Sequence, residues 1–525
     1  MDIRQENSDK MNPISAKEPE VLREELSLTR YLGESLRQAV VEGEVALPGG
    51  LREETVILSA EAMAVIEKTA VQTGRVDVDG KVIFHVLYTQ GDPTHISSLE
   101  AAADFSQTVE MPGARPGMNA PVSLMPEHVE ASAQGGRLKL MAILRLFTRL
   151  FSDDPISVVS GLRAQDGLMQ KTEVLKTSRT VASGVQDVLV RDECELSDVL
   201  QITDTLYATA AANVQEVMGG EERATISGSI ELEVTHLSAM PSRPLVITRH
   251  SIPFEETLSL IGENGDQLTA DAIVKDVAVL SQEGQEEGQR TLRAEVLLSL
   301  SAQTTQSRDV CLLLDAYTTQ GDLLKPATQP TRRVLAQRQV HTAESGKLTL
   351  LLDGQPPART PLTATLRPII TDLSKTGGKL NVEGMMEVCL LYMTDDTAVP
   401  QSYRTEEPFR MSFACDLSCP EAMVLQPTGI EVAGVTSDRV EVKYILHLCC
   451  YDVTLGQEPL VSDLSREPAP EEEQGLLLYF SQPGESLWDI AKRYRVSCDS
   501  LRRMNPSLEG DAVPDGQRVI LWRRG

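Results

Sequence analysis

The sequence predicts a mainly β protein, in which tandem repeat domains with a sandwich- or barrel-like fold precede a small α+β module of order βααβ. Two observations predict this fold class. Apolar and mostly polar residues alternate in three windows, at residues 75–88, 223–236 and 379–392, and a period of two is typical of strands with one buried face. Residues 476–525 instead combine helical apolar spacing with two short strand-like runs.

Residues 1–19 are a polar N-terminal tail that we expect to be disordered. They hold no apolar core, so we expect no secretory signal, and no run reaches the roughly eighteen apolar residues of a membrane span. The net charge is −28, with +2 on residues 476–525 and −30 on the rest. An acidic body repels nucleic acid and anionic lipid, so we expect neither as a main partner.

The three windows superimpose on Gly80, Gly228 and Gly384. Apolar residues stand two and four positions before each glycine, and two, four and six positions after it. Each glycine is in phase with the predicted buried face. A missing side chain there favours a β-bulge or a close backbone approach.

The repeat extends beyond these windows. Phe105, Phe254 and Phe409 follow the three glycines by 25, 26 and 25 residues, and alternating runs recur at 138–144, 292–298 and 440–446. The glycines are 148 and 156 residues apart, a period typical of tandem domains and not of a solenoid. We therefore predict three homologous β-rich domains at residues 20–165, 166–320 and 321–462, without choosing between a sandwich and a barrel.

The repeats show no shared constellation of chemically active residues. Five residues after the glycines stand His85, Glu233 and Cys389, three unlike groups in the phase expected to be exposed. Cys449 and Cys450 are adjacent and therefore alternate across a strand, and the chain has no paired zinc-knuckle spacing. The sequence also lacks phosphate-loop, nucleophile-elbow and dinucleotide fingerprints. We predict a protein without enzymatic activity, metal or cofactor.

Residues 463–474 are rich in glutamate and proline, which predicts an extended acidic linker. We expect this linker to let residues 475–525 move independently of the repeats. Within that module, Leu476–Phe480 predicts a strand, Ser486 with Asp489 a helix N-cap in a capping box, and Ser497 the cap of a second helix. Pro506 ends that helix, and Arg518–Trp522 predicts the closing strand.

This module resembles a LysM domain. The resemblance is carried by Tyr479, Pro483 to Trp488, Ile490-Ala491, Asn505-Pro506 and Gly516-Gln517. It implies binding of N-acetylglucosamine polymers in a groove between the loop that opens the first helix and the loop that follows the second. The residues implied at that groove are Gly484, Glu485, Ser486, Leu487, Trp488, Asn505, Pro506, Ser507 and Leu508. Capping and helix termination alone also explain Ser486 and Asn505-Pro506.

Three repeats, an acidic linker and a C-terminal LysM-like module together resemble SipL-type spore coat morphogenesis proteins of Clostridia. The resemblance implies a scaffold or adaptor whose module binds a SpoIVA-type coat ATPase at the forespore surface, inside the mother-cell cytosol. Eight irregularly spaced cysteines fit a reducing compartment. The alternative is an exported cell-wall protein that binds peptidoglycan or another glycan containing N-acetylglucosamine.

Overall fold

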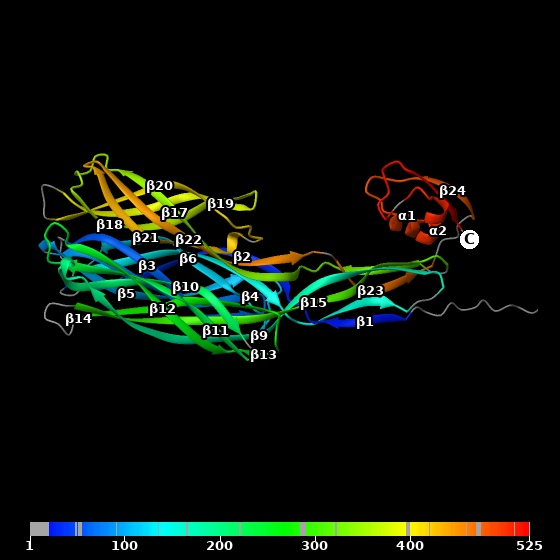
Figure 1. The fold of residues 1–525 in the computed structure, drawn as a ribbon, viewed down its shortest axis with the longest axis horizontal. Helices are drawn as coiled ribbons and strands as arrows, with labels where there is room; N and C mark the ends of the chain where they lie inside the picture. The colour runs from blue at the N-terminus through cyan, green and yellow to red at the C-terminus, as the bar shows by residue number, and fades with distance from the viewer. Residues whose placement is uncertain are drawn as a thin grey trace, which may run out of the picture.

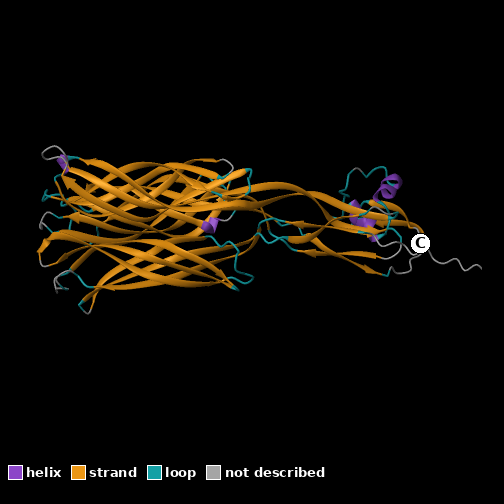
Figure 2. Ribbon diagram, turned by 90° about the horizontal axis from the view of Figure 1, so that it is seen from below, coloured by secondary structure: helices purple, strands orange, loops and turns teal. Residues whose placement is uncertain are grey.

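The computed structural model describes residues 20–523 except 48–49, 51–54, 91, 135, 164–165, 220–221, 284–289, 321–322, 395–398, 419, 458, 469–473 and 509. The predicted disordered tail, residues 1–19, therefore lies outside the described residues. Strands make up most of the described chain, and the two α-helices in it lie near the C-terminus (Figure 2). The predicted fold class is confirmed.

The elements recur in the same order in all three repeats. The first repeat contains β1 (Val21–Leu26), β2 (Arg30–Val45), β3 (Val56–Gln72), β4 (Arg75–Gln90), β5 (Asp92–Glu110), β6 (Val122–Gln134), β7 (Arg137–Ser152) and β8 (Ile156–Leu162). The second contains β9 (Leu168–Leu196), β10 (Ile202–Gly219), β11 (Arg223–Ser238), β12 (Leu245–Ser259), β13 (Ile261–Gly262), β14 (Gln267–Glu283) and β15 (Arg290–Thr318), with a short 3-10 turn at Asp198–Leu200. The third contains β16 (Leu323–Gln329), β17 (Arg333–Leu351), β18 (Thr360–Thr376), β19 (Lys379–Met393), β20 (Pro400–Phe413), β21 (Met423–Thr436), β22 (Arg439–Gly456) and β23 (Leu460–Glu467), with a 3-10 turn at Pro420–Ala422.

Each repeat folds as a sandwich of two antiparallel sheets. One sheet is a three-stranded meander: β3-β4-β5, β10-β11-β12 and β18-β19-β20. The other places the last long strand between the first strand and the strand before the last, in the orders β2-β7-β6, β9-β15-β14 and β17-β22-β21. The strand topology, which the sequence left open, is thus the same in all three repeats.

The marker glycines lie at the centre of each sandwich. They sit on the middle strand of each meander, directly opposite Phe105, Phe254 and Phe409 on the next strand. A Cβ on Gly80 would lie 2.2 Å from the carbonyl oxygen of Val65 and 2.8 Å from the Phe105 ring, and the other two glycines are equally crowded. On the preceding strand the register shifts next to each glycine's partner, as a β-bulge does. Both predicted reasons for a glycine are confirmed.

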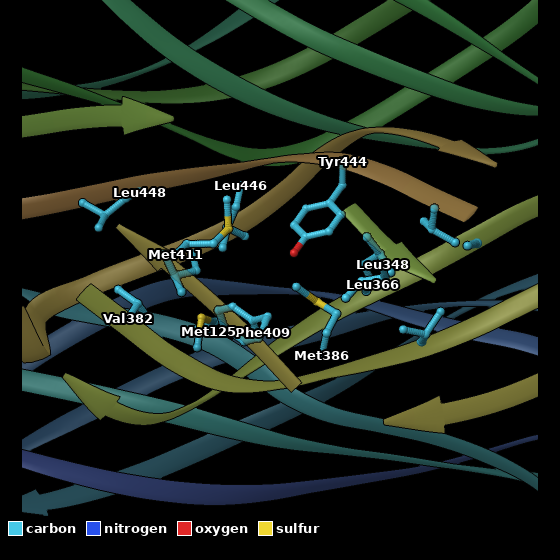
Figure 3. Close-up of a cluster of buried hydrophobic side chains, with 14 of the residues drawn as sticks. Met125, Leu348, Leu366, Val382, Met386, Phe409, Met411, Tyr444, Leu446 and Leu448 are labelled. Carbon is cyan, nitrogen blue, oxygen red and sulfur yellow. The ribbon is translucent and has the colours of Figure 1, made fainter. Parts of the chain in front are cut away.

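The three sandwiches pack around a common axis and form what we call the head (Figure 1). Contacts between the repeats are cyclic, since β5 lies against β10, β12 against β18 and β20 against β3. The axis is filled by one apolar cluster drawn from all three repeats: Leu58, Leu87, Ile96, Leu245, Leu362, Leu391 and Met393. The first repeat also contributes to the third core, because Met125 of β6 packs there beside Phe409 and Met386 (Figure 3).

This packing corrects one expectation from the sequence. His85 and Cys389 were expected on an exposed face, but both are buried. Alternation correctly placed them on the outer face of their own meander. That face is covered by the neighbouring repeats, and the ring of His85 stacks on Tyr207 of the second repeat at 5.1 Å. Glu233, at the equivalent position of the second repeat, is only partly buried.

Beyond the head, each repeat extends a two-stranded ribbon. The ribbons are β1 with β8, the first half of β9 with the second half of β15, and β16 with β23. The three ribbons pack on one another through two apolar clusters and form what we call the stalk (Figure 1). Where the stalk meets the head, the backbone of Thr29 bonds to Ser178 and to Val334, so all three repeats are joined there.

The third ribbon corrects the predicted linker. Residues 463–474 were expected to form an extended tether, but β23 continues to Glu467 and pairs with β16 along its whole length. Arg466 and Glu467 lie on this exposed part of the strand, and their charge made the segment look like a linker. Residues 469–473 lie outside the described residues.

Candidate binding site on the C-terminal module

The C-terminal module contains β24 (Gly475–Phe480), α1 (Leu487–Arg493), α2 (Cys498–Met504) and β25 (Arg518–Arg523), as the sequence predicted. Ser486 caps α1 in a complete capping box with Asp489, and Ser497 caps α2. β24 pairs with β25, and the helices pack on one face of this sheet around Leu487, Ile490, Leu501 and Leu521. Among the described residues, no helix has the length and apolar character needed to cross a membrane.

The nine predicted site residues have different surroundings. Gly484, Pro506 and Ser507 are exposed in the two loops, whereas Leu487 and Leu508 belong to the apolar core of the module. Asn505 is also buried: its side-chain amide donates to the carbonyls of Leu501 and Ile520, and its oxygen accepts from the Ile520 amide at 2.7 Å. Asn505 therefore joins the end of α2 to β25, a structural role that the residue type alone did not reveal.

The backbone amides at the start of α1 already have partners within the module. The Leu487 amide donates to the carbonyl of Asp511 at 2.7 Å, and the Trp488 amide donates to the carboxylate of the same aspartate. Ser486 and Asp489 complete the capping box. Any ligand at this loop would have to use its exposed side chains and carbonyls, because these amides are satisfied. A ligand-binding role for the loops stays a prediction.

Glu485 is held by three partners. Its carboxylate accepts from the Tyr479 hydroxyl at 2.7 Å and from the Gln482 amide at 2.8 Å, and it pairs with Arg493 at 2.5 Å. Desolvation alone would raise the pKa of this carboxyl, but these partners favour the charged form and hold the pKa below its usual range. Glu485 thereby fixes the turn Gln482–Gly484 against α1.

The hollow found on the module differs from the predicted groove. It is a shallow cavity of about 430 Å³ lined by Pro483, Gly484, Glu485, Asp489, Lys492 and Arg493. The first loop contributes Gly484 and Glu485, and the rest of the lining comes from Pro483 and α1. None of Asn505 to Leu508 lines it.

Trp488 faces the stalk. Its indole nitrogen donates to the carboxylate of Asp315 at 2.7 Å, and its ring meets the Tyr317 ring edge-on at 4.9 Å. Asp315 also accepts from Lys492 at 2.5 Å, and the Tyr317 hydroxyl donates to the carbonyl of Val496 at 2.7 Å. The expectation that the module is independent of the repeats is therefore wrong, because it packs on the end of the second ribbon.

Sequence reasoning missed an apolar surface on the module. Along β24, Leu477 and Tyr479 pack toward the helices, while the alternate residues face outward. The outer face carries exposed apolar side chains: Leu476 (65% exposed), Leu478 (57%), Phe480 (55%) and Trp522 (52%). The signal was present in the run Leu476–Phe480, because a strand that covers a core on one face only should alternate with polar residues. We call this surface the outer sheet face.

Comparison with known protein families identifies two parts of the chain. Residues 482–522 match the LysM domain. The C-terminal module is a LysM domain. Residues 55–134, which run from β3 to β6 in the first repeat, match the SipL, SPOCS domain. The two matches together are those of a SipL-type protein with a C-terminal LysM domain, as the sequence resemblance predicted. No curated protein and no solved structure matches the chain.

The SPOCS match covers the meander sheet and the next strand of the first repeat. The second and third repeats have the same strand order, the same buried glycine and the same opposing phenylalanine. LysM domains bind glycans such as N-acetylglucosamine, and the SPOCS domain is consistent with a sporulation-related protein.

Proposed function

We propose that this protein is a non-enzymatic scaffold of spore coat assembly whose LysM domain docks onto a SpoIVA-type coat ATPase at the forespore surface. The observation that supports the proposal is the presence of a SPOCS domain and a LysM domain in one chain. The repeats form an elongated body, and the LysM domain lies at the end of the stalk, where a partner can approach without meeting the head (Figure 1).

The outer sheet face is the surface we assign to this docking. A monomeric domain seldom exposes several large apolar side chains together, and such patches commonly mark protein interfaces. The Trp488 side of the LysM domain is covered by the second ribbon, and the amides at the start of α1 are bonded internally. The outer sheet face has no such cover from the described residues.

The mother-cell cytosol is the compartment that fits this role. Cys194, Cys311, Cys389 and Cys415 are free thiols, which persist in a reducing environment. The acidic body, with −30 on the chain outside residues 476–525, favours a partner other than nucleic acid or anionic lipid.

The test is binding of the full chain to the purified ATPase, with Leu478→Asp as the variant. Leu478 is 57% exposed, so the substitution spares the core but places a charge in the interface, and we expect at least a tenfold loss of affinity. Leu280→Asp is the matched control, because Leu280 on β14 is also 57% exposed. Equal binding by both variants excludes the outer sheet face, and no binding by the parent chain excludes the partner.

The second candidate function is glycan binding, which the LysM match favours. Titration of the full chain with chitooligosaccharide tests it. Saturable binding that is lost on substitution of Ser507, which is exposed in the second loop, would support this function. Saccharide binding without affinity for the ATPase would favour a cell-wall protein over a coat scaffold.

A further inference from the structure

The ends of the three ribbons are equivalent in fold but differ in side chains. Val159, Leu313 and Val461 occupy the same place in the apolar cluster of the stalk. Four residues further along stand Arg163, Tyr317 and Ser465. An aromatic residue is present at this position only in the second repeat.

The residues that lie opposite Arg163, Tyr317 and Ser465 on the paired strands differ in the same way: they are apolar in the second ribbon and charged in the other two. Tyr317 pairs with Met169, and both side chains pack into the core of the LysM domain. In the first ribbon, Arg163 instead forms an ion pair with Glu20 at 2.6 Å. In the third ribbon, Ser465 lies opposite Lys325. Among the described residues, the first and third ribbons therefore carry polar side chains at this position, whereas the second carries two large apolar ones, Tyr317 and Met169.

We infer that the end of the second ribbon is a docking surface dedicated to the LysM domain of the same chain. It combines an apolar centre, Tyr317 and Met169, with a polar rim. In that rim Asp315 binds both Trp488 and Lys492, Lys171 pairs with Asp511 at 3.7 Å, and Arg495 donates to the Thr318 carbonyl. Such an arrangement of apolar centre and polar rim is typical of specific interfaces.

The connection to the third ribbon makes docking within one chain favourable. β23 ends at Glu467 and β24 begins at Gly475, so seven residues join them and span at most about 28 Å. The third ribbon lies beside the second, since Val461 and Leu313 share one cluster. A short connection raises the effective concentration of the LysM domain at this surface to about the millimolar range, so a small interface is enough to hold it.

Docking fixes which sides of the LysM domain are available. The side with Trp488 and the Val496 carbonyl is closed against Tyr317, while the outer sheet face stays open. This inference concerns the chain alone and does not require the proposed partner.

The test uses the fluorescence of Trp488 in the full chain. The chain has two tryptophans, so Trp522→Phe, at a half-exposed position, leaves Trp488 as the only one. In that background, Tyr317→Ser gives the second ribbon the residue of the third, and Asp315→Asn removes the charge that binds Lys492. We expect the rate constant for acrylamide quenching of Trp488 to rise about threefold or more in the double variant.

Asp463→Asn is the matched control. Asp463 stands two residues after Val461, as Asp315 stands two after Leu313, and it is likewise ion-paired, here with Arg23. We expect no change in quenching from this control, and circular dichroism checks that the stalk stays folded in every variant. Quenching of the parent chain as fast as that of the double variant overturns the inference.

A second measurement distinguishes docking within one chain from docking of a second copy. The measurement is the acrylamide quenching of Trp488 at a series of protein concentrations, with sedimentation to give the oligomeric state. Slow quenching that is independent of concentration in a monomer, and that is lost when Tyr317→Ser is added, supports the inference. Quenching that becomes faster as an oligomer dissociates on dilution shows that the docked LysM domain belongs to another copy and overturns it.

Discussion

At the residue scale, the three buried glycines set the shape of each sandwich. Gly80, Gly228 and Gly384 let a phenylalanine ring and a bulged strand approach the middle strand more closely than any side chain would permit. The bulge bends the meander so that its inner face closes over the core.

We expect Gly228→Ala to destabilise the protein by about 3 kcal/mol, because a Cβ would lie 2.1 Å from the Asn213 carbonyl oxygen and 2.9 Å from the Phe254 ring. Thermal unfolding measures this loss. Gly33→Ala is the control: Gly33 also lies in a strand, but its Cβ would meet no atom within 4 Å. Equal unfolding temperatures for the two variants would contradict this account of the glycine.

Glu61 lies between the repeats of the head, where its carboxylate accepts from the Tyr207 hydroxyl of the second repeat. Burial raises its pKa from 4.5 to about 7; Glu233 of the second repeat adds to this rise, whereas Arg367 of the third repeat and the Tyr207 hydroxyl oppose it. In the unfolded chain Glu61 returns to its ordinary pKa. Between pH 4.5 and 7 the folded state therefore binds more protons, and its stability falls as the pH rises through this range.

The variant Glu61→Gln should remove this dependence. Glutamine resembles the protonated form, so we expect equal unfolding temperatures of variant and parent at pH 4.5 and a higher one for the variant at pH 7.5, by about 2 °C or more. Comparing variant with parent cancels the opposite dependence of His85, whose pKa burial lowers to about 4. A temperature difference that is the same at both pH values would show that Glu61 is charged throughout.

The residue scale also shows where sequence reasoning stops. Periodicity identified the buried positions of β4, β11 and β19, because alternation depends only on the strand itself. It could not show that Asn505 binds the backbone of β25, because those contacts depend on the tertiary fold. Nor could it show that Trp488 meets Tyr317, which lies 171 positions away in the sequence.

At the element scale, the ribbons were the part least visible in the sequence. β9 and β15 each run 29 residues, through the head and into the stalk, without a turn signal at the junction. The same element is interrupted in the first repeat, where β1 is separate from β2. The strand runs that the sequence predicted in the repeats all lie in the head, and none of them indicated the ribbons of the stalk.

The position of β23 gives a prediction for truncated chains. A chain ending at Glu467 keeps the third ribbon, whereas one ending at Gln457 loses β23 and exposes the surroundings of Leu460 and Val461, both 1% exposed. We expect the shorter chain to be less stable by about 4 kcal/mol, the contribution of two buried aliphatic side chains. Thermal unfolding of the two chains measures the difference, and equal stability would show that β23 contributes nothing to the stability of the stalk.

At the whole-molecule scale, the three repeats are joined through shared apolar clusters and backbone hydrogen bonds. They share the axial cluster, the backbone bonds around Thr29 and the two clusters of the stalk. No repeat can unfold without exposing the core of its neighbours. The sequence revealed three similar domains. It did not reveal the surfaces that join them, because the residues at these surfaces differ between the three repeats and do not form a repeated pattern.

We therefore expect one cooperative calorimetric transition for the head and stalk. Leu391→Ala, at a position 1% exposed on the axis, should lower the temperature of that single transition. Separation into two or three transitions, one of them unaffected by the substitution, would mean that the repeats unfold independently.

The equivalence of the ribbons has a consequence for stoichiometry. A trimer assembled from three identical chains would display three identical ends, and any change to one would appear in all. Joining the three copies in one chain frees each to vary alone, so Tyr317 occurs once while its counterparts are Arg163 and Ser465. The protein thus has the cyclic packing of a symmetric trimer, but it carries a single LysM domain on one of its three ribbon ends, in one orientation.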